Sequence, residues 1–173
     1  MNKLLILLLC FTLASCASPD VEQYAQQTPK LSLQDYLNGD LEAWGMFQDR
    51  SGDVIKRFHV KMTGTWKGDT GTLDERFTYS DGSTERRVWT LTLQPDGSWQ
   101  GTADDVEGTA VGMLAGNAFH WRYTLRLPVD GRTWLVDLDD RMYLIDENVM
   151  LNRAVMSKWG INLGSITLSF YKP

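Results

Sequence analysis

Large apolar side chains alternate with polar ones through residues 73–105, and this alternation predicts three consecutive strands. A period of two residues is typical of a strand that buries one face. The alternation stops at residues 80–82 and 95–97, which suit three-residue hairpin loops with a glycine in the left-handed conformation. Loops of this length fix the register of the strands. The predicted cross-strand pairs are Glu75–Arg87, Leu73–Trp89, Leu93–Trp99 and Arg87–Asp105.

The same period recurs through most of the remaining chain, so we expect an all-β fold. Residues 108–116, with a glycine at every fourth position, fit a bent strand or a strand–loop–strand corner. About ten short strands, spaced by roughly eight to twelve residues, indicate an antiparallel sandwich or barrel. Mostly tight hairpins favour an up-and-down barrel of about 8–10 strands. The other predicted strand segments are residues 43–50, 54–66, 118–127, 134–140, 141–145, 149–156 and 161–171.

A short helix is expected just before the first strand. Ser32 and Asp35 have the spacing of a capping box, and Asn38 and Gly39 would end the helix. Such a helix could plug one end of a barrel. A surface turn is the alternative interpretation of the same residues.

Residues 1–15 have the organisation of a secretion signal. Lys3 precedes an apolar run, residues 4–13, that is too short to span a bilayer as a mature helix. Residues 13–16 read Leu-Ala-Ser-Cys and resemble the bacterial lipobox, which implies cleavage before Cys16 and lipidation of that cysteine. Several acyl chains would hold the protein stably at a membrane. The residue after Cys16 is Ala17 and not an aspartate, and this favours sorting of the lipidated protein to the periplasmic face of the outer membrane. An ordinary signal peptide without lipidation is the alternative interpretation of these residues.

These features divide the chain into a signal peptide (1–15), a mobile lipidated tether (16–30) and a barrel domain (31–173). Loss of the signal removes Lys3 from the 17 basic residues and leaves all 22 acidic ones, so the predicted mature chain has a net charge of −6. This acidity argues against nucleic acid as a partner and against a polybasic membrane patch. Cys10 leaves with the signal, so no free thiol is expected for a disulfide, a nucleophile or a metal.

The chain also contains six short motifs: Phe47-Gln-Asp-Arg-Ser-Gly, Tyr79-Ser-Asp-Gly, Arg87-Val-Trp89, Gly101-Thr-Ala-Asp-Asp-Val, Tyr123-Thr-Leu-Arg-Leu-Pro-Val-Asp-Gly131 and Ser157-Lys-Trp-Gly160. Together they resemble an uncharacterised family of proteobacterial lipoproteins with a lipocalin-like barrel. The resemblance covers about residues 31–170. It implies the fold and a location in the cell envelope, but it assigns no activity and no catalytic residue.

The charged row Glu75, Arg87 and Asp105 is the most specific candidate site. If the aromatic face of these strands points inward, the three charges are buried, and a buried arginine must be well hydrogen-bonded. The row could anchor a polar group in a ligand cavity, or it could be an ion-pair network that fixes strand register. A barrel of eight or more strands can enclose a ligand, so the inner aromatic residues could either line a cavity or fill it. These residues are Trp89, Trp99, Trp121, Tyr123 and Trp134.

Other familiar catalytic and metal-binding patterns are missing from the sequence. His59 and His120 lie on the polar faces of their strands, without a second histidine or a cysteine at ligand spacing. The serines lack a Gly-x-Ser-x-Gly motif, and adjacent aspartates on a strand point to opposite faces. We therefore expect no metal and no cofactor.

Two hypotheses for the function follow. The first is a lipid-anchored outer-membrane protein that binds or carries a small apolar ligand, such as a fatty acid or another lipid, inside the barrel. The alternative is an enzyme of isomerase or hydratase type that acts on a lipid through Glu75, Asp105 or Asp140. A structural lipoprotein with a filled barrel is a third possibility.

Overall fold

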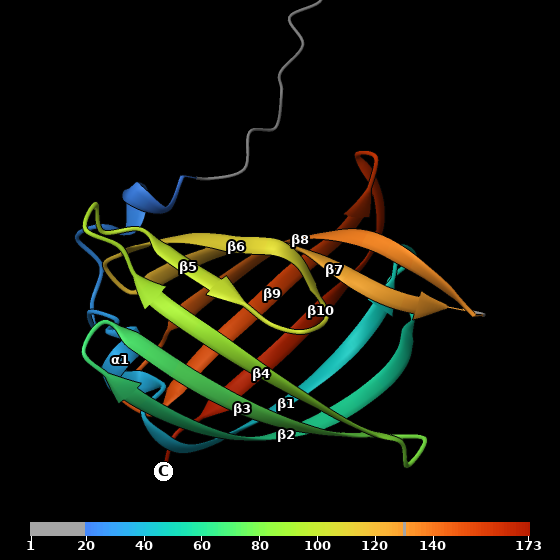
Figure 1. Cartoon of the computed structure of the whole chain (residues 1–173), viewed down its shortest axis with the longest axis horizontal. Coiled ribbons are helices and arrows are strands. Elements are labelled where there is room, and N and C mark those ends of the chain that lie inside the picture. The colour runs from blue at the N-terminus through green and yellow to red at the C-terminus, as the bar shows by residue number, and fades with distance from the viewer. Residues whose placement is uncertain (1–19, 130) are drawn as a thin grey trace, which may run out of the picture.

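The computed structural model describes residues 20–129 and 131–173. Ten antiparallel strands form one closed barrel, in which strands adjacent in sequence are also adjacent in space and β1 pairs with β10 (Figure 1). The predicted all-β, up-and-down barrel is therefore confirmed. The strands are β1 (Gly39–Asp49), β2 (Val54–Lys67), β3 (Thr70–Tyr79), β4 (Thr84–Leu93), β5 (Trp99–Thr102), β6 (Val106–Ala115), β7 (Ala118–Val129), β8 (Arg132–Leu144), β9 (Val149–Lys158) and β10 (Ile161–Tyr171).

The register of the central meander is the one that the loop lengths predict. Glu75 pairs with Arg87 across β3 and β4, and the next inward pair on the same face is Leu73 with Trp89. Gly82 in the intervening loop has a φ of +82°, a backbone conformation that a residue with a Cβ rarely adopts. The inward faces of these strands thus carry large apolar side chains together with a charged pair.

Two predicted strand assignments differ from the structure, and the bent-strand alternative for the glycine-rich segment is confirmed. β5 ends at Thr102, and Asp105 lies in the turn before β6. Residues 134–144 belong to one long strand, β8, rather than to two. The glycine-rich segment is the bent strand β6, whose register with β7 shifts between Glu107 and Val111, where Gly108 has a φ of +66°.

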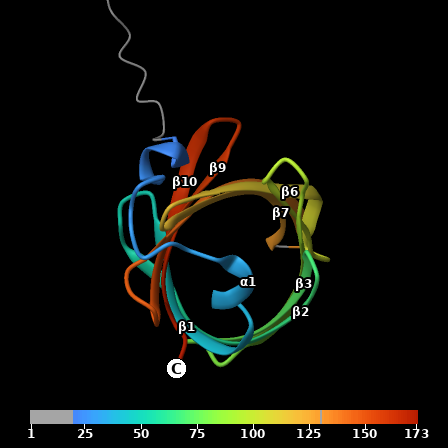
Figure 2. The ribbon, with the colours of Figure 1, turned by 90° about the vertical axis from the view of Figure 1, so that its left-hand side faces the viewer.

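A short helix, α1 (Leu33–Tyr36), covers one end of the barrel (Figure 2). The Ser32 hydroxyl accepts a hydrogen bond from the backbone N–H of Asp35 at 3.2 Å, as the capping pattern predicts. Leu33 and Tyr36 are buried, so α1 is a plug and not a surface turn. The chain can approach β2 here because Gly64 has no side chain; a Cβ at this position would lie 1.6 Å from the carbonyl oxygen of Leu37.

The segment expected to be a mobile tether packs against the barrel from residue 20 onward. A 3₁₀ helix, η1 (Val21–Tyr24), buries Val21 between Ala115 and Ala118 at the β6–β7 turn. The backbone N–H of Leu31 then donates to the carbonyl of Gly116 at 2.8 Å. Within the predicted tether, residues 20–30 therefore lie against the barrel, held by the buried Val21 and by Tyr24, whose ring packs against Tyr143 at 5.2 Å. The predicted signal peptide and Cys16 lie outside the described residues.

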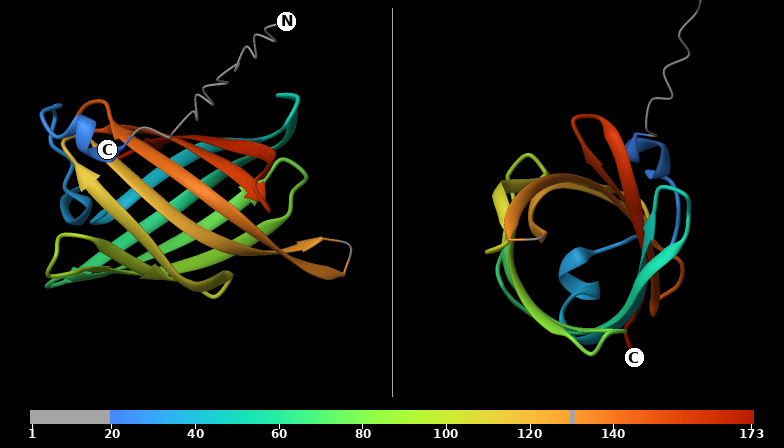
Figure 3. Two further views of the ribbon diagram at one scale, coloured as in Figure 1. Left: turned by 90° about the horizontal axis from the view of Figure 1, so that it is seen from above. Right: turned by 90° about the vertical axis from the view of Figure 1, so that its right-hand side faces the viewer.

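The two ends of the barrel differ in construction. The N-terminal segment and α1 lie at one end, here called the α1 end. The β1–β2, β3–β4, β7–β8 and β9–β10 hairpins lie at the other, here called the hairpin end (Figure 3). Among the described residues, no helix is long and apolar enough to cross a membrane.

Candidate ligand cavity

The barrel interior contains a cavity of about 130 Å³. It extends from Leu33 of α1 to Phe47, Tyr79 and Leu125, near the hairpin end, and most of its lining is aromatic or aliphatic. An apolar void of about 150 Å³ is large enough to hold a benzene molecule. The barrel is therefore hollow enough for a small ligand or for a short alkyl chain of a larger one.

Two glycines, Gly101 and Gly112, make room for Trp121, a central residue of the cavity wall. A Cβ on Gly101 of β5 would lie 2.6 Å from the Trp121 ring, and one on Gly112 of β6 would lie 2.5 Å from it. Trp121 packs edge-on against Trp89 with ring centroids 5.7 Å apart. The glycines of the sequence thus shape the cavity by fixing where this indole lies.

The predicted charged row is formed at one side of the cavity. Arg87 Nε donates to Asp105 Oδ2 at 2.8 Å, and Nη2 donates to the same oxygen at 2.6 Å. Glu75 is 9% exposed, and its Oε2 lies 3.8 Å from Arg87 Nη1, too far for a hydrogen bond. This oxygen is buried and has no hydrogen-bond partner among the described residues.

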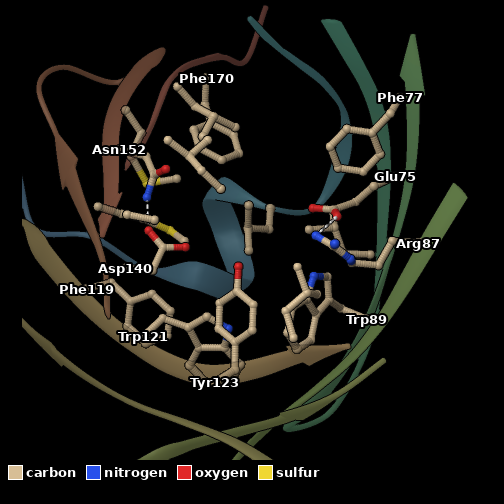
Figure 4. A pocket seen from close by; sticks show the side chains of 18 of the residues that line it. Glu75, Phe77, Arg87, Trp89, Phe119, Trp121, Tyr123, Asp140, Asn152 and Phe170 are labelled. Carbon is tan, nitrogen blue, oxygen red and sulfur yellow. Dashed lines mark hydrogen bonds and ion pairs between the residues drawn. The ribbon is translucent and has the colours of Figure 1, made fainter. Parts of the chain in front are cut away.

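A second carboxyl group faces the cavity from the other side. Asp140 of β8 is buried and accepts a hydrogen bond from the side-chain amide of Asn152 on β9. Tyr123 of β7 lies between the two sides, and Figure 4 shows its hydroxyl directed into the cavity, as are the carboxyl groups of Asp140 and Glu75. Three oxygen-bearing side chains from β3, β7 and β8 therefore converge on one apolar space.

Burial controls the protonation of these groups. Desolvation raises the pKa of Glu75 to about 7, against the opposing effect of Arg87, and Asp105 and Asp140 add to the rise. Desolvation likewise raises the pKa of Asp140 to about 7, although the hydrogen bond from Asn152 lowers it. Burial also raises the pKa of the Tyr123 hydroxyl above its usual value. Near neutral pH, both carboxyl groups can therefore either give or take a proton.

The structure brings five of the seven predicted site residues together around the cavity: Glu75, Arg87, Trp89, Trp121 and Tyr123. Trp99 does not border the cavity; it is buried against Trp66, with ring centroids 5.8 Å apart. Asp105 also lies outside the lining and reaches Arg87 from the β5–β6 turn. Asp105 therefore orients the arginine without facing the cavity.

Trp134, expected on the inner aromatic face, lies at the hairpin end and is 41% exposed. The β7–β8 hairpin extends beyond its neighbours: β6 pairs with β7 only as far as Leu125, and β9 pairs with β8 only as far as Asp137. An inward-facing residue beyond these points has no opposite wall to pack against.

The sequence analysis named Asp140 as a possible acid or base but did not place Asp140 or Asn152 in the cavity lining, where the structure has both. A usable signal exists, because the β7–β8 register pairs Asp140 with Trp121, a residue that the sequence already assigns to the inner aromatic face. Asn152 lies between the buried Met150 and Ala154 at a two-residue period, which also places it inside. Both polar residues interrupt an otherwise apolar inner face.

The two histidines lie on the outer face, as expected. His59 Nε2 is 2.7 Å from a Glu42 carboxylate oxygen, and His120 Nε2 is 3.1 Å from Asp139. Residues 20–129 and 131–173 contain no group of three or more metal-ligating side chains.

Exposed apolar side chains are concentrated on two hairpins at the hairpin end. We call this set the apolar rim; it comprises Leu127, Val129, Trp134, Leu135, Trp159, Ile161 and Leu163. The Nζ of Lys158 lies 5.1 Å from the ring centroid of Trp134 and 4.8 Å from that of Trp159, so the β7–β8 and β9–β10 hairpins are neighbours. Trp159 is 83% exposed, which is unusual for so large an apolar side chain.

Comparison with solved structures shows the same kind of barrel at low sequence identity. An S-type phycobiliprotein lyase, CPES, from Guillardia theta has a TM-score of 0.62 and 6% identity, with 90% of this chain and 98% of that chain covered. A protein of unknown function from the DUF3598 family of Nostoc punctiforme has a TM-score of 0.57 and 12% identity; the match covers 85% of this chain and 51% of that one. At these identities the likeness concerns the fold alone.

No curated protein matches the sequence. A family model described as "Protein of unknown function (DUF3833)" matches residues 10–172, nearly the whole chain. The chain therefore belongs to the DUF3833 family.

Proposed function

We propose that this protein is a membrane-anchored binding protein that holds a small, largely apolar ligand in the barrel. The observation that carries the proposal is the cavity, which combines an apolar, aromatic lining with a few convergent polar groups. Ligand sites in proteins have this composition: the apolar surface supplies affinity and the polar groups supply orientation. The alkyl chains of lipids, fatty acids included, are the kind of apolar group that such a lining accommodates.

The apolar rim supports a location at a membrane. Trp159 and Trp134 are amphipathic aromatic side chains of the kind that concentrate at membrane–water interfaces. Lys158 lies over both rings, and the exposed Arg132 belongs to the same hairpins, so cations are available for lipid phosphates. Lipidation of Cys16 at the periplasmic face of the outer membrane is the second part of the proposal. It rests on the lipobox-like residues 13–16.

Ligand binding is tested by displacement of a neutral, environment-sensitive dye from the purified protein. Ala154→Phe should abolish dye binding, because Ala154 is buried and borders the cavity. Arg153→Phe introduces the same side chain at the next residue, on the exposed outer face, and should bind like the wild type. Equal binding by both variants would place the dye outside the cavity and contradict the proposal.

Membrane contact is tested with the lipid-anchored protein reconstituted into vesicles that contain bromine-labelled phospholipid. Bromine quenches nearby tryptophan fluorescence, so Trp159→Phe should remove a large part of the quenching. Trp44→Phe is the matched control, because Trp44 is also exposed, at 50%, but stacks on His59 on the side of the barrel. If both variants lose the same share of quenching, the apolar rim does not contact the membrane.

Acid–base catalysis is the second candidate function, favoured by one observation. Glu75 and Asp140 face the same cavity, and both have a pKa raised to about 7, which suits proton transfer at neutral pH. An isomerase or hydratase could use such groups on an apolar substrate. Profiling of membrane lipids from cells carrying Glu75→Gln tests this function: a changed product pattern with normal protein levels supports it, and an unchanged pattern excludes a role for Glu75.

A further inference from the structure

We propose that the cavity selects ligands whose head group is a positively charged nitrogen, such as a protonated amine, over ligands that end in a carboxylate. This inference rests on the proposed binding function and narrows its ligand class. It is carried by the arrangement of charged side chains around the cavity.

The cavity lining carries more acidic than basic side chains. Two carboxyl groups, Glu75 and Asp140, face the cavity from different strands, whereas Arg87 is the one basic side chain among the described lining residues. Above about pH 7, where Glu75 and Asp140 are largely ionised, a ligand carboxylate beside them would meet like charges in a poorly solvated space. Burial of like charges is unfavourable, whereas a cation there would be compensated.

Arg87, the basic side chain of the lining, is already hydrogen-bonded to Asp105. Its guanidinium makes three hydrogen-bond contacts with Asp105, between 2.6 and 3.1 Å, and stacks over the Phe77 ring at 5.5 Å. Asp105 lies behind the arginine, outside the cavity lining. A ligand carboxylate would have to compete with this bidentate pair, which is the strongest arginine–carboxylate geometry.

Glu75 offers a hydrogen-bond acceptor that no donor among the described residues satisfies. The carboxyl group of Glu75 faces the cavity (Figure 4), and its buried Oε2 has no hydrogen-bond partner among the described residues, since Arg87 Nη1 lies 3.8 Å away. A buried oxygen without a donor is costly, and a ligand N–H would satisfy it. Trp89 and Trp121 also line the cavity, and aromatic rings attract cations. An amine supplies both the donor and the charge.

Binding of a cation should also release protons. The buried carboxyl groups hold protons up to about neutral pH, and a cation beside them favours their ionised forms. A primary amine stays protonated across this range, as lysine does with its usual pKa of about 10.4. Affinity for an amine should therefore rise between pH 6 and pH 8. The other groups that act on Glu75 or Asp140 include Arg87, Asp105, Glu85, Tyr123, Asp139, Asn152 and the backbone of Arg141.

The test compares three ligands of equal chain length, namely octylamine, octanol and octanoate, by displacement of a neutral dye from the full lipid-anchored protein in detergent. Octylamine should bind about tenfold or more tighter than octanoate at pH 8, as expected for one hydrogen bond to a charged group. Calorimetry in buffers of different ionisation enthalpy should show proton release with octylamine and none with octanol.

Variants identify the groups responsible. Glu75→Gln and Asp140→Asn should each reduce the ratio of octylamine affinity to octanoate affinity, measured within each variant. Glu147→Gln, a change at an exposed turn residue, should behave like the wild type. Octanol binding without any preference for the amine, or a preference for octanoate, would overturn this inference and leave the binding function standing. Failure of all three ligands to displace the dye would overturn both.

Discussion

Glu75 lies directly opposite Arg87 in the β3–β4 ladder, yet their charged atoms come no closer than 3.8 Å, while the guanidinium binds Asp105 at 2.6 Å. The strand register brings the pair together, and the turn residue Asp105 decides where the guanidinium points. Arg87 is thus held at the wall, and one Glu75 oxygen is left facing the cavity. We expect both the stability of the barrel and the ligand preference proposed above to depend on this division.

Arg87→Met should destabilise the protein by about 3 kcal/mol, because it leaves Glu75 and Asp105 without their cation in a largely buried place. Urea unfolding measures the change. Arg86→Met is the matched control: Arg86 pairs with Asp74 on the exposed outer face, and such surface pairs contribute less than about 1 kcal/mol. A loss below about 0.5 kcal/mol for Arg87→Met would mean that the charges are well solvated.

The buried carboxyl groups should make stability depend on pH in a defined direction. Their pKa values rise from 4.5 for Glu75 and 3.8 for Asp140 in the unfolded chain to about 7 in the folded one. The folded state therefore binds extra protons, and this contribution is full below about pH 4 and is lost as pH rises through 7.

The Glu75→Gln/Asp140→Asn double variant stays neutral at these positions at every pH. Relative to wild type, its free energy of unfolding should increase between pH 5 and 7 by about 1.4 kcal/mol per pH unit for each group. Denaturant unfolding at several pH values measures the difference. Parallel curves for the two proteins would show that the carboxyl groups are not shifted.

Gly64→Ala should destabilise the α1 end by roughly 1–3 kcal/mol, because the new methyl group would collide with the backbone carbonyl of Leu37. Hydrogen exchange should show faster opening of α1. Thr65→Ala changes the adjacent, exposed residue and should have little effect. Unchanged protection of α1 in Gly64→Ala would contradict the close approach.

Gly82→Val should cost about 1–2 kcal/mol, because a β-branched side chain is strained at the φ of +82° in the β3–β4 loop. Space is not limiting, since nothing lies within 4 Å of a Cβ built there. Thermal unfolding provides the measurement. Ser80→Ala, in the same loop, should be mild, and an equal loss in both variants would argue against a conformational cause.

Cys16→Ser should block lipidation and leave an uncleaved precursor, because the lipobox resemblance assigns both steps to this residue. Membrane fractionation and the mass of the purified chain test the prediction. A variant that is cleaved and fractionates with the outer membrane like wild type would remove the case for a lipid anchor.

The inner face of the barrel was predictable wherever local chemistry sets the register. Period-two alternation and the residues 80–82 loop were enough to place Glu75 opposite Arg87, and Ser32 with Asp35 predicted the start of α1. These signals act over a few residues, so they do not depend on how the strands are assembled.

Other features depend on the closed barrel and could not be predicted from local patterns. Trp89 of β4 and Trp99 of β5 both point to the inside of the barrel. Only Trp89 borders the cavity, because Trp66 packs against Trp99. Trp134 continues the inner face of β8 past the point where neighbouring strands stop. The docking of Val21 depends on a small recess at the β6–β7 turn, which a polar segment does not reveal.

The seam between β1 and β10 has a consequence for how the molecule forms. It pairs Glu42 with Tyr171 and Phe47 with Ile166, so the barrel closes through contacts between opposite ends of the domain. Contacts so distant in sequence make folding slow, typically milliseconds to seconds for all-β domains. A chain that emerges N-terminus first must keep the edge of β1 unpaired until its last strand arrives. During that interval, this edge is the part of the molecule most open to pairing with another chain.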